Sequence, residues 1–176
     1  NNKSTAELLR LVADVESTIS NSIFSRNTFG SFICSNLSRI AAYNNCVFTN
    51  NKAITALAHY ISFTKDTLSL RNCTFAKNDI RQMNSLEANQ SIKLAFNCAL
   101  LDIYNKFRFL NTQIYGEFSH CYFDTIDCSI LPSYMCGPGN LTGADPLFRD
   151  TANHDYSLLP CSPLINAGSN AAAAGI

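Results

Sequence analysis

The sequence has no tryptophan, no net charge and few charged residues of either sign. Thirteen Lys and Arg balance thirteen Asp and Glu, and charged residues make up 15% of the 176 residues, against about 25% in ordinary soluble domains. A chain without a basic excess offers no electrostatic basis for binding nucleic acid or an anionic membrane. It also contains no run of about 20 apolar residues, so we predict no membrane insertion by this segment.

A short motif recurs five times along the chain, at intervals of 23 to 27 residues. Its key position is a small residue: Ser22, Cys46, Cys73, Cys98 and Cys121. The residue before it is Asn21, Asn45, Asn72, Asn97 and His120. Two residues after it come Phe24, Phe48, Phe75, Leu100 and Phe123. Three residues before it lies an apolar residue: Ile19, Tyr43, Leu70, Ala95 and Phe118.

The motif predicts one bend between two short strands. Side chains alternate along a strand, so the small residue and the large apolar residue two positions later point to the same side, the interior. Asn tolerates the left-handed backbone region and can turn the chain in one step. A period near 25 holds three short strands and is too short for a βαβ unit. We therefore predict an all-β fold, a parallel β-helix of about five coils.

Four of the eight cysteines fall on the motif and are expected to be structural. We predict an interior column of free thiols, Cys46, Cys73, Cys98 and Cys121, beside a column of corner residues, Asn21, Asn45, Asn72 and Asn97. A metal site needs ligands that converge on one point, and a straight column does not supply them. His120 replaces the corner Asn, which favours a structural over a catalytic role.

The residue pattern changes after residue 126, where the repeated motif ends. We therefore divide the chain into coils over 1–126 and an irregular C-terminal closing module over 127–176, packed on the last coil. Ser162 suits a helix N-cap, Pro163 the first helical position and Gly168 the residue after its end. Leu164 and Ile165 would then cover the open end of the stack, whose unpaired strand edges need protection.

Two further sites are predicted in this module. Cys128 and Cys136, eight residues apart, form the preferred disulfide, and Cys161 with Cys136 is the alternative, because spacing does not fix connectivity. Asp150, Asn153 and Asp155 supply oxygen atoms that could bind calcium, although Asp and Asn are equally typical of turns. No other cofactor is predicted.

Three segments of the module carry a resemblance to a known family. They are Asp145-Pro146-Leu147-Phe148, Asp155-Tyr156-Ser157-Leu158, and the stretch from Ser162 to Gly168. Together with the Asn-Cys-x-Phe coils they resemble the closing signature of secreted bacterial right-handed parallel β-helix proteins with a choice-of-anchor-like end module, common in Bacteroidetes. The resemblance implies a secreted or cell-surface location, coils upstream of Asn1 and a sorting domain after Ile176.

No catalytic cluster stands out, so we predict no catalytic residues and a non-catalytic surface module, stalk-like or adhesin-like, that binds a glycan or a protein partner. One alternative is the C-terminal part of a carbohydrate-active enzyme, a polysaccharide lyase or glycoside hydrolase, which needs two or more acid–base groups close together. Another is a cargo or partner of a bacterial secretion or surface complex.

Overall fold

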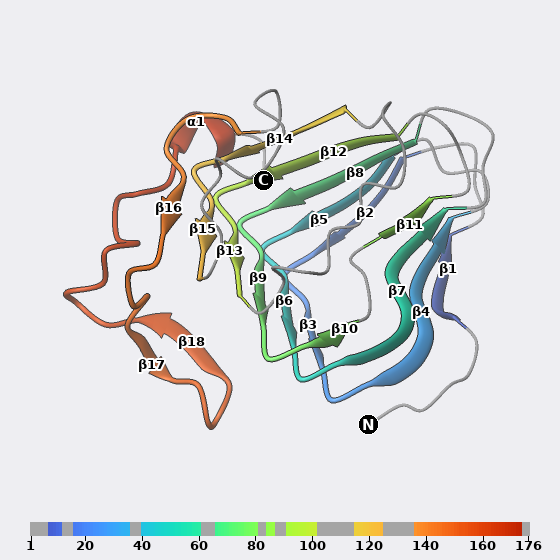
Figure 1. The fold of residues 1–176 in the computed structure, drawn as a ribbon, viewed down its shortest axis with the longest axis horizontal. Helices are drawn as coiled ribbons and strands as arrows, with labels where there is room; N and C mark the ends of the chain where they lie inside the picture. The colour runs from blue at the N-terminus through green and yellow to red at the C-terminus, as the bar shows by residue number, and fades with distance from the viewer. Residues whose placement is uncertain are drawn as a thin grey trace.

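Strands dominate the computed structural model, which describes residues 7–11, 16–35, 40–60, 66–80, 84–86, 91–101, 115–124 and 136–173. Three sheets are parallel throughout, and one two-stranded sheet is an antiparallel hairpin. Figure 1 shows the three parallel sheets as the sides of a prism, with the hairpin beside one of them. The predicted all-β class and the parallel pairing are confirmed for these residues.

Sheet A contains β1 (Glu7–Leu11), β4 (Thr28–Ser35), β7 (Lys52–Tyr60), β10 (Asp79–Ile80) and β11 (Asn84–Leu86). Sheet B contains β2 (Glu16–Ser20), β5 (Ile40–Asn44), β8 (Asp66–Arg71), β12 (Ser91–Phe96) and β14 (Tyr115–Ser119). Sheet C contains β3 (Ile23–Ser25), β6 (Val47–Thr49), β9 (Thr74–Ala76), β13 (Ala99–Leu100), β15 (Tyr122–Phe123) and β16 (Leu141–Thr142). The hairpin is β17 (Phe148–Asp150) with β18 (Asp155–Leu158), and α1 spans Asn170–Ala173.

The chain passes through sheets B, C and A in the same order several times. We call each passage a rung and number the rungs 1 to 5 by their key residues, from Ser22 to Cys121. Each rung pairs with the next so that equal motif positions lie side by side: Phe24 pairs with Phe48, and Phe48 with Phe75. The sequence alignment of the motif is therefore the register of the sheets.

The core is a set of columns that run through the stacked rungs. The rings of Phe24 and Phe48 stack at 5.0 Å between centroids, and those of Phe48 and Phe75 at 4.5 Å with 3° between planes. Leu100 and Phe123 continue this column and are at most 1% exposed. The burial of these side chains confirms that the key position and the position two residues later point inward. Removal of the large apolar side chains from water stabilises this arrangement.

Two corners shape each of the first three rungs. The first corner lies between sheets B and C, at Asn21, Asn45, Asn72, Asn97 and His120, all with φ between 50° and 55°. This confirms the predicted role of Asn, and His120 takes the same corner position in rung 5. The second corner lies between sheets C and A, at Arg26, Asn50 and Lys77, with φ between 53° and 56°. The sequence did not predict the second corner, because Arg and Lys are not typical of the left-handed region.

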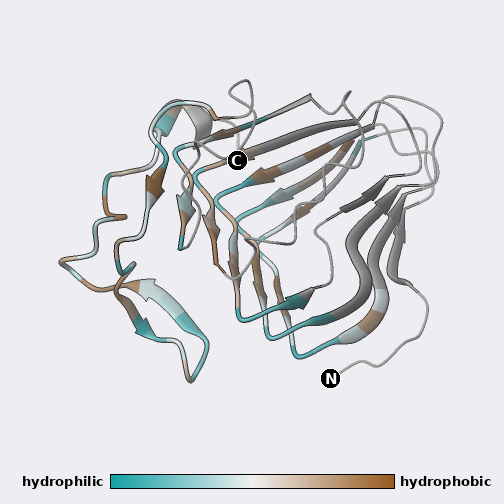
Figure 2. Cartoon of the chain, viewed as in Figure 1, coloured by the Kyte–Doolittle hydropathy of each residue, from teal (hydrophilic) through white to brown (hydrophobic). Residues whose placement is uncertain are grey.

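Amide side chains line both corners. In the outer amide ladder, Asn45, Asn72 and Asn97 each donate from Nδ2 to Oδ1 of the preceding rung's Asn, at 3.0 to 3.2 Å. In the inner amide ladder, just after the second corner, Asn27 donates to Asn51 and Asn51 to Asn78, both at 3.1 Å. The two ladders donate in opposite directions along the stack. Figure 2 shows the chain at the second corner as hydrophilic, although Asn27, Asn51 and Asn78 are buried.

Residues 136–173 continue from the last rung and then turn back along the stack. Strand β16 extends sheet C beyond β15, while the hairpin β17–β18 lies beside sheet C in Figure 1. Ser162 accepts a hydrogen bond at Oγ from Leu164 N, so it caps a turn as predicted, yet Ile165 is 42% exposed and does not serve as a cover. Within the described residues, no helix has the length and apolar character needed to cross a membrane.

Candidate binding groove

A groove of about 530 Å³ separates the outer face of sheet C from the C-terminal segment. Its floor is a row of outward positions in sheet C: Thr74, Ala99 and Tyr122, each directly after a key residue, and Leu141, which are partners in register across β9, β13, β15 and β16. Ala99 is a small neighbour of the larger Tyr122 on this row. The short side chain at this position leaves room in the groove.

One wall of the groove is the end of the outer amide ladder. Asn97 donates from Nδ2 to the backbone oxygen of Ser169 at 3.0 Å, and Ser169 N donates back to Asn97 Oδ1 at 2.8 Å. A Cβ atom at Gly168 would lie 3.2 Å from Asn97 Oδ1, so the absent side chain permits this close approach. Asn72, Asn97 and His120 therefore face the groove as a polar edge.

The opposite wall is the hairpin. The rings of Phe148 and Tyr156 meet edge to face at 5.3 Å, and both line the groove with Leu158. Tyr156 OH lies 2.6 Å from Thr49 Oγ1, which ties β18 to β6 of rung 2. The wall is thus built from an aromatic pair fixed against the stack.

The hairpin turn crosses the second corner of three successive rungs. Arg26 Nη2 lies 2.6 Å from His154 Nε2, and Asn50 Nδ2 lies 3.1 Å from His154 Nδ1. Lys77 Nζ donates to Thr151 O at 3.1 Å. The side chains of Arg26, Asn50 and Lys77, which the sequence did not single out, hold the turn of the hairpin in place.

The cysteine column lies inside the stack, buried beneath the strands of sheet C. Cys46, Cys73, Cys98 and Cys121 are free thiols with at most 2% exposure. Each donates from Sγ to the backbone oxygen two residues earlier, at 3.2 to 3.4 Å. Ser22 Oγ does the same to Ser20 O at 2.9 Å in rung 1. The cysteines are therefore packing residues, as the sequence predicted.

The thiols hold their protons strongly. Burial, and after it the neighbouring thiol of Cys121, raise the pKa of Cys98 well above its ordinary value. The hydrogen bond between Cys46 and Cys73 lowers the pKa of Cys73, but the bond to Cys98 and burial outweigh it and raise that pKa to about 12. A protonated thiol is a poor nucleophile and a poor metal ligand.

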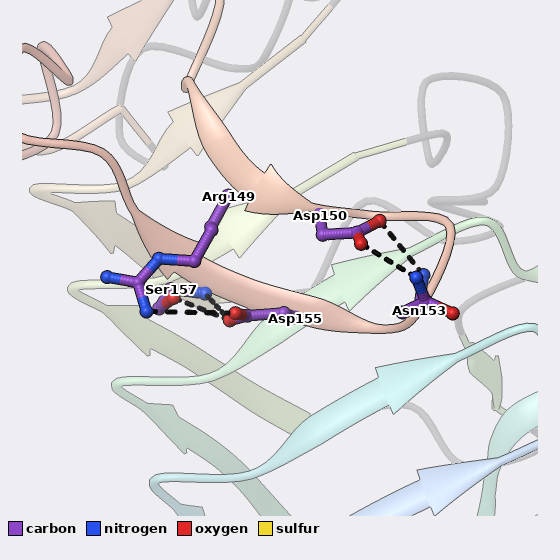
Figure 3. Close-up of polar contacts among 5 residues, drawn as sticks. All are labelled: Arg149, Asp150, Asn153, Asp155 and Ser157. Atoms are coloured by element: carbon purple, nitrogen blue, oxygen red, sulfur yellow. Dashed lines mark hydrogen bonds and ion pairs between the residues drawn. The ribbon is translucent and has the colours of Figure 1, made fainter.

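The predicted calcium ligands form two turn motifs at the hairpin (Figure 3). Asp150 accepts hydrogen bonds from Ala152 N, Asn153 N and Asn153 Nδ2, and the last of these is the main cause of its lowered pKa. Asp155 accepts from Ser157 N and Oγ, which lowers its pKa as well. In Figure 3 the two carboxylates point in opposite directions along the hairpin.

These contacts match the turn role that the sequence also predicted for Asp150, Asn153 and Asp155. Across the part of the chain that the structure describes, no group of three or more His, Cys, Asp or Glu could hold a metal ion. The calcium site, which relies on an Asn oxygen as well, stays a prediction.

The predicted disulfide lies partly outside the described residues. Cys136 is described and does not occur among the free thiols, whereas Cys128 falls in the segment 125–135. The pairing of Cys128 with Cys136 therefore stays a prediction. The alternative pairing of Cys161 with Cys136 is wrong, because Cys161 is an exposed free thiol.

No family model matches this chain, and comparisons with curated proteins and with solved structures likewise found no match. The groove and its walls are therefore interpreted from their own residues.

Proposed function

We propose that this chain is a right-handed parallel β-helix module of a secreted or cell-surface bacterial protein, and that it binds a ligand or partner without catalysing a reaction. The repeated passage through sheets B, C and A supports the β-helix, since each connection joins parallel strands across the other two sheets. Connections between parallel strands are right-handed in the great majority of proteins. The Bacteroidetes-type resemblance of the motifs supports the location.

The observation that carries the binding role is the chemistry of the groove. Among its described lining residues there is no Asp, Glu, Lys or Arg, while amides, hydroxyls and aromatic rings are frequent. Hydrolysis of a glycosidic bond typically uses two carboxyl groups about 5 to 9.5 Å apart. A cavity of several hundred Å³ with a few convergent polar groups is typical of a ligand site.

Incubation of the full-length protein with a panel of neutral and acidic polysaccharides tests this proposal. We expect no release of reducing ends and no unsaturated sugar. Reproducible turnover that is lost on replacement of a carboxylate would instead establish the carbohydrate-active enzyme alternative. Purification of the native protein in a stable complex with secretion components would favour the cargo alternative.

A further inference from the structure

The groove beside sheet C has a lining whose chemistry identifies a class of ligand. We infer that it binds an uncharged oligosaccharide segment, an inference that rests on the binding role proposed above. The occupant lies on the floor row Thr74–Ala99–Tyr122, with the amide edge on one side and the aromatic pair of Phe148 and Tyr156 on the other.

The polar edge retains hydrogen-bonding capacity after the ladder is formed. Within the described residues, Asn72 uses one amide hydrogen toward Asn45 and one lone pair toward Asn97. A primary amide has two hydrogens and a carbonyl oxygen with two lone pairs, so Asn72 keeps one donor and one acceptor site. His120, which also borders the groove, has a buried Nδ1 without a hydrogen-bond partner among the described residues, so Asn72 supplies the accessible polar sites.

A site that binds a sugar needs hydrogen-bond donors and acceptors close together. Each hydroxyl of a sugar both donates and accepts a hydrogen bond, and a side-chain amide offers both a donor and an acceptor in return. The apolar face of a sugar ring can pack on an aromatic side chain, while the polar tip of that side chain stays hydrogen-bonded. Tyr156 shows this arrangement, with its ring in the groove wall and its hydroxyl on Thr49.

Other ligand classes fit the lining less well. A charged ligand would find no charged side chain among the described lining residues to balance it, and burial of an unpaired charge is costly. A peptide added as a strand needs an unpaired sheet edge, whereas the floor of this groove is the face of sheet C. An apolar ligand would leave the remaining donor and acceptor of Asn72 without partners.

Filling the floor tests the inference without altering the core. Ala99→Phe places a ring in the groove, because position 99 points outward between Thr74 and Tyr122. Val47→Phe is the matched control: it adds the same ring to the same outward row, at a position that does not line the groove. Circular dichroism and thermal unfolding of both variants verify that the fold is retained.

The probes are cellotriose, maltotriose, mannotriose, xylotriose and chitotriose as neutral ligands and trigalacturonate as an acidic one, measured by calorimetry and saturation-transfer NMR. We expect at least one neutral trisaccharide to bind, at least tenfold weaker binding to Ala99→Phe, and less than twofold change in Val47→Phe. Failure of all five to bind, equal binding to Ala99→Phe, or preference for trigalacturonate would overturn the inference. None of these outcomes involves turnover, so each is distinguishable from failure of the non-catalytic proposal.

Discussion

Arg26 and His154 are 128 residues apart in the sequence and 2.6 Å apart in space. A guanidinium group can only donate hydrogen bonds, so Arg26 is the donor in this contact. The pair joins the turn of the hairpin to the second corner of rung 1. It is the longest-range of the contacts that hold the groove's aromatic wall in place.

Loss of this contact should loosen the hairpin but not the stack. We expect Arg26→Ala, which leaves the Asn50–His154 contact in place, to weaken the hairpin by about 1 kcal/mol, the usual size of a single hydrogen bond. Hydrogen exchange of the β17–β18 amides should then become about fivefold faster, while exchange in β5 and β8 stays unchanged. Arg149→Ala is the control, because its ion pair with Asp155 is long, at 4.0 Å, and mostly exposed. Equal effects of the two variants would show that the Arg26 contact does not hold the hairpin.

The inner amide ladder should contribute more to the free energy of unfolding than the more exposed outer amide ladder. Asn51 accepts from Asn27 N and Asn27 Nδ2 and donates to Phe24 O and Asn78 Oδ1, and it is 1% exposed. We expect Asn51→Ala to lower the free energy of unfolding by about 3 kcal/mol, because buried backbone groups lose these bonds. Urea unfolding followed by circular dichroism gives the value. A loss below about 1 kcal/mol would contradict this account.

The first corner makes a separate prediction about backbone conformation. Asn45 has φ of 55°, a region open to Gly at little cost but strained for Ala. Asn45→Ala should therefore destabilise the protein by about 1 kcal/mol more than Asn45→Gly, although both remove the same two ladder bonds, to Asn21 and from Asn72. The same urea experiment compares them. Equal stability of the two variants would show that the corner is not held by its backbone geometry.

The stacked ring column predicts a graded response to substitution. Phe48 lies between Phe24 and Phe75 and is 1% exposed. Phe48→Ala should cost about 3 to 5 kcal/mol through the cavity that it leaves. Phe48→Leu should cost less than about 2 kcal/mol, since Leu100 occupies the same column in rung 4. Thermal unfolding of both variants tests the order, which would be wrong if Leu were as damaging as Ala.

The buried thiols predict a loss of stability in alkali. The pKa of Cys73 is about 12 in the folded chain, against about 8.5 in an unfolded one. The unfolded chain therefore loses its proton first, and the stabilisation, complete below pH 8.5, declines as pH rises toward 12. Cys73→Ser removes this titration and keeps a donor of the kind that Ser22 supplies.

Urea unfolding at pH 7.5 and pH 10 measures the effect of that substitution. The decline over this interval should be about 2 kcal/mol smaller in Cys73→Ser than in the parent chain. The comparison between variants cancels the titration of Tyr and Lys, which both proteins share. An identical decline in the two proteins would show that the Cys73 proton is not linked to folding.

The repeat was predictable because its signal is spread over five copies with matched columns. Asn at the corner and Phe two residues past the key position each have one plain physical reason, so alignment of the segments gave the register directly. The apolar run Ile54 to Leu57 predicts a strand, and it falls within β7. The segment Ser4 to Val15 fits either a helix capped by Ser4 or a buried strand, and the structure forms a strand over Glu7–Leu11. The polar segment Asp79 to Gln90 predicts a coil edge or loop, whereas its described residues form β10 and β11. The strand that the sequence predicts at Phe107 to Leu110 lies outside the described residues.

The groove was harder to predict because no motif marks it. Its floor depends on which outward positions are small, and Ala99 matters only beside the larger Tyr122. Its walls depend on contacts over long sequence distances, such as Thr49 with Tyr156. The uneven outward row was the one signal present in the sequence. Tyr104, Tyr115 and Tyr134 are the rings that the sequence suggests for stacking on sugars. Tyr115 begins β14, and the other two lie outside the described residues.

The hairpin's position across the second corner has a mechanical consequence. Arg26, Asn50 and Lys77 belong to three successive rungs, and all three side chains contact the segment Thr151–His154. When tension pulls one of these rungs away from the next, it also loads the hairpin that bridges them. Separation of any of the first three rungs then breaks a contact with the hairpin as well as strand pairing, so the hairpin links the mechanical response of all three.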